Sequence, residues 1–141
     1  MRSQVWWYTA RSAGIVAWAL ASLSVIGGLQ LSTRLVRKPA PNWVLDVHRF
    51  VAGLSVAFVA VHLAGLAADS YIDFSPAELF VPLVTTYKPA AVALGVVAMY
   101  LLLAIELTSL AMRRMPRRAW HAVHLTSFVL FVFATVHGLT A

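Results

Sequence analysis

The residues best suited to chemistry in this chain are its five histidines, and they lie in only two of its apolar segments. His48 and His62 share one segment, while His121, His124 and His137 belong to the other. Imidazole is a common ligand of transition metals. The chain has no cysteine, which excludes disulfides, iron–sulfur clusters and c-type haem attachment. The histidines are therefore the candidate metal ligands.

The spacing of the histidines limits which of them can act together. His48 and His62 are fourteen residues apart, which on an α-helix leaves them about 40° from a common face and about 21 Å apart along the axis. His124 and His137 are thirteen residues apart, about 19.5 Å by the same rise but about 140° from a common face on an ideal helix. Rotation of the imidazoles, a bulge or helix tilt has to absorb that angle. Two histidines this far apart on one helix cannot share one metal ion.

The depth of the histidines predicts how they pair. His48 and His124 each follow a tryptophan by four or five residues, and tryptophan is enriched at membrane interfaces. His48 is then level with His124, and His62 is level with His137. Two imidazoles at each of two depths is the arrangement that two bis-histidine b-type haems require. A lone membrane histidine can simply bond a neighbouring helix, but four at matched depths favour ligation.

Composition and hydropathy predict the elements that position these histidines. The chain has 141 residues, of which 61% are hydrophobic and 11% charged, against roughly a quarter charged in soluble domains. Four apolar runs are each long enough to cross about 30 Å of hydrocarbon as a helix. We predict a single domain, residues 1–141, that is an all-α integral membrane four-helix bundle with helices at about 13–31, 43–68, 89–112 and 119–141.

Positive charge predicts the orientation of the bundle. The basic residues lie in short clusters between apolar runs, which is typical of membrane topology rather than of nucleic-acid binding. Such clusters follow the first and third runs, at Arg34, Arg37 and Lys38 and again at residues 113–118, and loops of this kind stay in the cytoplasm. We therefore expect a multi-pass protein in the lipid of the plasma membrane, with both termini outside and no nucleic-acid partner. A cleaved signal peptide in the first run is the less favoured alternative.

The longest outer loop, between the second and third runs, has a helix-start signal. Ser75-Pro76-Ala77-Glu78 has the form of a capping box with proline at the first helical position. We predict a short amphipathic helix that runs to about Leu83 and lies on the outer membrane surface.

The chain resembles the ferric reductase-like transmembrane domain family, which includes ferric-chelate reductases, NADPH oxidases and the haem subunit of the bacterial methionine sulfoxide reductase system. The likeness covers essentially the whole chain and is closest to small actinobacterial members. The matching elements are His48-Arg49, Gly53 and His62 on one helix, and Trp120, His124 and His137-Gly138 on the other. The resemblance implies two haems b that move electrons across the membrane, an inner one on His48 and His124 and an outer one on His62 and His137.

Arg49 and Gly53 are further candidates for cofactor contacts. A guanidinium binds carboxylates in bidentate fashion, so Arg49 is a candidate partner of a haem propionate, with a role as a topology anchor as the alternative. Arg117 and Arg118 are candidates for the same two roles, and the role as topology anchors is favoured for them. Gly53 either makes room for a flat macrocycle or allows close helix packing.

Two more residues have open roles. His121 is predicted to be an interfacial histidine, with a role as an alternative ligand less favoured. Glu106 lies within the third run, where an acid is costly unless it is paired. Pairing with a nearby arginine is favoured, and a proton-transfer or propionate-coupled role is the alternative.

The chain departs from many members of the family. They have six core helices and a cytosolic flavin- and nicotinamide-binding region, whereas this chain has four helices and no glycine-rich nucleotide loop; truncation at Ala141 is an alternative explanation. We expect a separate donor, either a flavoprotein or a quinol, and an external acceptor such as a ferric chelate, oxygen or a redox protein. The chain would then be the haem-containing part of an oxidoreductase. A quinol-linked cytochrome b subunit and a haem-free structural or assembly subunit are the alternatives.

Overall fold

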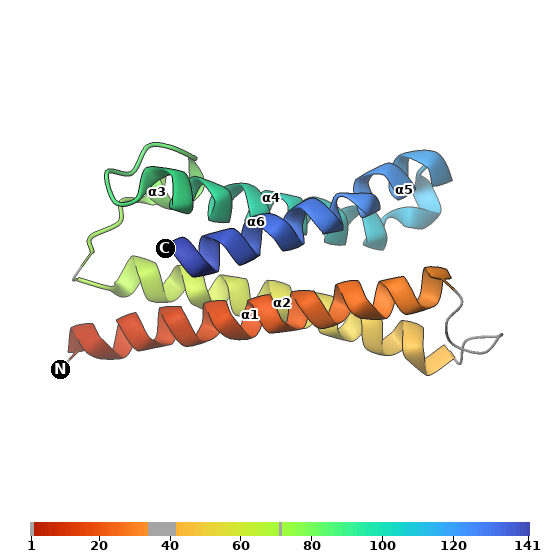
Figure 1. Ribbon diagram of the computed structural model, residues 1–141, viewed down its shortest axis with the longest axis horizontal. Coiled ribbons are helices and arrows are strands. Elements are labelled where there is room, and N and C mark those ends of the chain that lie inside the picture. The colour runs from red at the N-terminus through yellow and green to blue at the C-terminus, as the bar shows by residue number, and fades with distance from the viewer. Residues whose placement is uncertain (1, 34–41, 71) are drawn as a thin grey trace.

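The computed structural model describes residues 2–33, 42–70 and 72–141, and within these ranges its regular elements are all helices. The helices, shown in Figure 1, are α1 (Arg2–Thr33), α2 (Asn42–Ala68), α3 (Pro76–Phe80), α4 (Pro89–Leu110), the 3₁₀ helix η1 (Met112–Arg114), α5 (Arg117–Leu125) and α6 (Ser127–Thr140). The predicted basic cluster at Arg34, Arg37 and Lys38 lies outside the described residues.

Four helical stretches are long and apolar enough to cross a membrane, which confirms the all-α membrane fold. They are Gln4–Thr33, Asn42–Ala68, Pro89–Leu110 and Arg117–Thr140. Few side chains of these stretches are buried inside the protein, as expected where lipid covers the apolar surface. The start of α1 and the end of α6 lie at the same end of the bundle in Figure 1. Which side of the membrane this end faces remains a prediction.

The long helices associate as two pairs. α1 packs along α2, and α4 packs along α6, while the α1–α6 and α2–α4 contacts join the pairs (Figure 1). The tightest approach of α1 to α2 is at Gly65, where an added Cβ would lie 2.9 Å from the backbone nitrogen of Ala10. Leu102 and Ile105 of α4 pack with Leu130 of α6 in the main apolar cluster. The backbones of α2 and α6 make little direct contact, so their side chains meet across the space between the pairs.

Helix α1 begins at Arg2, well before the predicted start at residue 13. The polar residues of this segment do not end the helix, because their side chains find partners within it. Thr9 and Ser12 donate their hydroxyls to the carbonyls one turn earlier, at 2.8 and 2.7 Å. Arg11 places its guanidinium 4.9 Å from the centre of the Trp7 ring, a cation–π contact. The prediction was wrong because it read these polar residues as a boundary.

The predicted single helix at 119–141 is divided at Thr126 into α5 and α6. Thr126 has φ −66° and ψ −5°, and its N–H bonds the carbonyl of Val123 at 3.0 Å, three residues earlier. A 3₁₀ turn advances about 120° per residue, against about 100° in an α-helix. This overwinding turns His124 and His137 toward a common face. It absorbs a small part of the angle that their thirteen-residue spacing creates, and side-chain rotation has to supply the rest.

The loop between α2 and α4 contains the predicted short helix, α3. Ser75 Oγ accepts from the Glu78 N–H at 3.4 Å, and the Glu78 carboxylate accepts from the Ser75 N–H at 2.9 Å, so both halves of the capping box are present. The helix ends at Phe80 rather than Leu83, because the backbone of Val81 is extended, with φ −112° and ψ 120°. The Tyr100 hydroxyl donates to the Phe80 carbonyl at 2.7 Å and ties the end of α3 to α4.

Candidate metal centres

The four histidines expected at two depths meet in two pairs between the helix pairs. The ring centroids of His48 on α2 and His124 on α5 are 6.1 Å apart, with an interplanar angle of 65°. Those of His62 on α2 and His137 on α6 are 6.4 Å apart, with an angle of 81°. We call the first two residues the inner pair and the other two the outer pair, after the predicted orientation. The structure thus brings together the same partners that the depth argument proposed.

The distance within each pair fits two imidazoles that bind opposite sides of one metal ion. Imidazole nitrogens bind transition metals at about 2.0 Å and lie about 1.1 Å from the ring centre, so the two centroids are expected about 6.2 Å apart. The observed separations of 6.1 and 6.4 Å both agree with this value. A direct hydrogen bond is not present within either pair. The donor set and its spacing therefore fit bis-histidine haem iron at each site.

In three of the four rings, the Nδ1 atom is hydrogen-bonded to a backbone carbonyl of a neighbouring helix. The Nδ1–O distances are 2.7 Å for His62 to Ala10, 2.8 Å for His137 to Ala91 and 2.9 Å for His48 to Ser24. A carbonyl oxygen only accepts, so each of these Nδ1 atoms carries the hydrogen. The lone pair is then on Nε2, which is the tautomer that a metal-binding histidine with a bonded Nδ1–H needs.

His124 is held differently from the other three. Its Nδ1 is 3.5 Å from the hydroxyl of Ser109 on α4. The indole of Trp120 stacks on its ring, with centroids 4.9 Å apart and planes 27° apart. The same indole N–H donates to the Ser109 hydroxyl at 3.4 Å. Ser109 and Trp120 therefore position this ring together.

Glycines let the neighbouring helices approach the backs of the rings. An added Cβ would lie 3.0 Å from His62 Nδ1 at Gly14 and 2.7 Å from His137 at Gly95. At Gly28 it would lie 3.4 Å from the His48 ring. The sequence analysis had considered Gly53 for close packing but not Gly14. Gly14 lies four residues after Ala10, whose carbonyl accepts from His62.

Arg49 and Gly53 gain no contact that supports their candidate roles. Arg49 is exposed and has no ion-pair partner among the residues that the structure describes. Gly53 has nothing within 4 Å of an added Cβ, so it is not a close-packing glycine. It lies about 140° around α2 from His48, which does not favour contact with a group bound at that ring. Both roles stay predictions.

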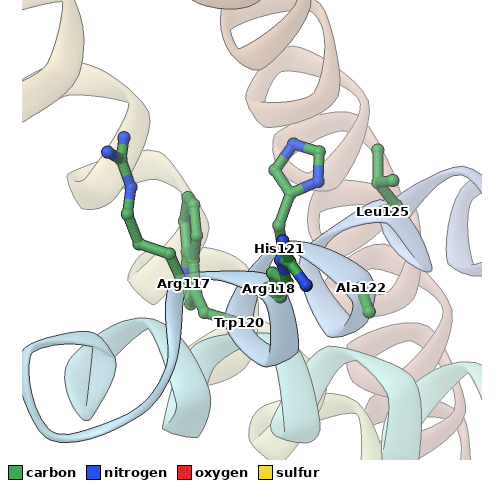
Figure 2. Close-up of a pocket in the computed structure, with 6 residues that line it drawn as sticks. All are labelled: Arg117, Arg118, Trp120, His121, Ala122 and Leu125. Atoms are coloured by element: carbon green, nitrogen blue, oxygen red, sulfur yellow. The ribbon is translucent and has the colours of Figure 1, made fainter.

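A cavity of about 430 Å³ adjoins the inner pair through Trp120 (Figure 2). It is lined by Arg117, Arg118, Trp120, His121, Ala122 and Leu125, all from α5. The His121 ring is exposed and projects from α5 beside Trp120, with ring centroids 6.2 Å apart. It is not a member of either histidine pair. The two arginines and His121 give the cavity a basic lining.

The favoured pairing of Glu106 with an arginine is not observed. Glu106 is half-buried on α4, and it has no ion-pair partner in the described part of the chain. Its neighbours on the same helix face are Leu102, which is buried, and Ser109, which contacts His124. The side chain thus lies at the margin of the face that α4 turns toward the inner pair.

These features define a multi-pass helical membrane protein with paired histidines between its helices. Comparison with known families gives a match to "Ferric reductase like transmembrane component" over residues 13–135, and the chain belongs to that family. Members of the family generally carry out haem-mediated electron transfer across a membrane. The match includes His48, His62 and His124 and ends two residues before His137. Comparisons with curated proteins and with solved structures found no match.

Proposed function

We propose that this protein carries electrons across the membrane through two b-type haems, one held by the inner pair and one by the outer pair. The observation that carries the proposal is the separation of 6.1 and 6.4 Å between ring centroids in two pairs. A haem-free structural or assembly role gives no reason for imidazoles to face one another at this spacing twice. When bound, a haem supplies a reversible one-electron couple whose potential the protein tunes through its axial ligands and surroundings.

The chain's own residues fix the ligands. The Nδ1–H bonds to Ala10, Ser24 and Ala91 hold each ring in one orientation and make its Nε2 more basic. Because α2 is a continuous helix, His48 and His62 stay about 21 Å apart along its axis. The two sites are therefore held at fixed depths, which an electron path from one membrane face toward the other requires.

The direction of transfer and the partners are part of the proposal. We place the protein in the plasma membrane with its arginine-rich ends in the cytoplasm, so that a separate flavoprotein or a quinol delivers electrons to the inner pair. The acceptor is external and is a ferric chelate, oxygen or a redox protein. The basic cavity beside Trp120 supports entry at the inner end, since Arg117, Arg118 and His121 attract an acidic donor.

Haem content of the purified full-length chain tests this proposal. We expect two haems b per chain and a reduced spectrum typical of bis-imidazole iron. His62→Ala or His137→Ala should each remove one haem, and His48→Ala or His124→Ala the other. His121→Ala is the matched control, and it should keep both haems because its ring belongs to neither pair. A protein that stays colourless after expression with added haem would refute the proposal, as would unchanged spectra in the pair variants.

A further inference from the structure

The two histidine pairs are not anchored equally. In the outer pair both Nδ1 atoms bond carbonyl oxygens, at 2.7 Å for His62 and 2.8 Å for His137. In the inner pair His48 has two acceptors on Ser24, the carbonyl at 2.9 Å and the hydroxyl at 3.2 Å. His124 has only the Ser109 hydroxyl at 3.5 Å, which is the limit of a useful hydrogen bond. His124 is therefore the one ring of the four without a short hydrogen bond behind it.

The helix that carries His124 is also short and lacks a side-chain cap. α5 has nine residues, its N-cap Pro116 offers no side-chain hydrogen bond, and it ends at the Thr126 break directly after Leu125. His48 and His62 lie within the 27 residues of α2, which packs along α1. A short, weakly capped segment opens at lower free energy than a long packed helix.

Space is available beside the His124 ring. Trp120 stacks on this ring and also lines the cavity of about 430 Å³ over α5 (Figure 2). Leu125 and Ala122 make part of the cavity wall apolar. A small neutral molecule in this cavity would therefore contact the indole that stacks on the His124 ring. The outer pair has Gly14 and Gly95 closely packed behind its rings instead.

From these three observations we infer that His124 is the iron ligand that a small molecule displaces, whereas His62 and His137 of the outer pair stay bound to their iron. This rests on the proposed function. With haem held by the inner pair and reduced, a small neutral ligand such as carbon monoxide would displace His124. The bond from iron to Nε2 would break, a bond from iron to the carbon atom would form, and no electron would be transferred. Ser109 and Trp120 are positioning residues that oppose this exchange.

Carbon monoxide titration of the reduced, haem-loaded full chain tests the inference by its visible spectrum. We expect one molecule bound per two haems. Ser109→Ala should raise the affinity by up to about 10-fold, the lower end of what loss of a partner behind a metal ligand causes. Ser109→Thr keeps the hydroxyl and should bind like the unmodified protein. Thr108→Ala is the matched control, because this hydroxyl bonds only the Ala104 and Ile105 carbonyls of its own helix.

A variant without the outer haem identifies the site. His62→Ala should lose the outer haem, as proposed above, and should still bind one molecule of carbon monoxide at the inner iron. Loss of carbon monoxide binding in His62→Ala would mean that the unmodified protein had bound it at the outer iron, which overturns the inference. Binding to both haems or to neither in the unmodified protein, or equal affinities in Ser109→Ala and Thr108→Ala, overturns it as well. Haem content is measured first, because absent haem refutes the proposed function, whereas two haems without carbon monoxide binding refute this inference alone.

Discussion

Substituting Gly95 by alanine should damage the outer site selectively. The added Cβ would lie 2.7 Å from both Cε1 and Nδ1 of His137 and 2.9 Å from its Nε2. Ordinary van der Waals contact begins at 3.4 Å, so the ring has to retreat by about 0.7 Å or α4 and α6 have to separate. Both changes cost free energy, because the His137 ring is bonded to the carbonyl of Ala91, which lies on α4 one turn before Gly95.

The size of the effect follows from this contact. Overpacking by one methyl group costs about 1–3 kcal/mol. A retreat of about 0.7 Å would also lengthen the 2.8 Å bond between His137 Nδ1 and the Ala91 carbonyl to the limit of a useful hydrogen bond, which adds about 1 kcal/mol. Loss of a partner behind a metal ligand lowers metal affinity about 10- to 100-fold. We expect the Gly95→Ala variant to lose most of its outer haem and to unfold at a lower temperature.

The assay is the haem-to-protein ratio together with thermal unfolding in detergent. Gly138→Ala is the matched control, since it adds the same methyl group next to His137 and meets nothing within 4 Å. It should retain two haems and the original unfolding temperature. If Gly95→Ala behaves like Gly138→Ala in both measurements, the close approach of α4 to this ring is not what positions it.

Three other perturbations test separate parts of the fold. The hydrogen bond from Ser75 lowers the pKa of Glu78, so its stabilisation of α3 is present above the usual pKa of 4.5 and lost as the pH falls below it. Faster amide exchange in α3 on acidification should show this, and Glu78→Gln should abolish the pH dependence. Trp18→Phe removes the 2.9 Å hydrogen bond to Thr135 and should lower the free energy of reversible unfolding by about 0.6 kcal/mol. An unchanged free energy would mean that this hydrogen bond contributes no stability. Thr126→Ala removes the 2.6 Å bond from the threonine hydroxyl to the Val123 carbonyl. It should let α5 and α6 join and weaken haem binding at the inner pair, and unchanged haem affinity would contradict this.

Much of the fold was predictable because each membrane helix has a local sequence signal, a long apolar run. Hydropathy alone located four spans, and the Ser75-to-Glu78 motif located α3. The meeting of His48 with His124 could be predicted because each follows a tryptophan at a similar distance along its helix. The end of α3 was missed although Pro82 signals it, because the residue before a proline, here Val81, is disfavoured in the helical region and adopts an extended backbone. The break at Thr126 was foreseen only as a need for some irregularity, since its position depends on one local 3₁₀ turn.

The partners behind the rings were not predictable. Three are backbone carbonyls, which every residue possesses, and Ala10 reaches His62 across 52 positions of sequence. Only the glycines at the contact points could have indicated them, and glycine has several other uses in membrane helices. The weak anchoring of His124 was hidden for the same reason. The difference is in what α4 presents to it, a serine hydroxyl instead of a carbonyl.

The arrangement of the helix pairs couples cofactor binding to folding. α2 and α6 make little direct contact, and the pairs are joined by the α1–α6 and α2–α4 contacts and by bonds such as Trp18 to Thr135. Both histidine pairs lie in this same interface. A metal that bridges His62 to His137 would therefore stabilise the association of the two halves as well as its own site, because it binds the folded state and not the separated helices. Retention of haem and resistance to unfolding should consequently fall together when either pair is disrupted, and a variant that loses one haem without losing thermal stability would show that the helix pairs hold together without it.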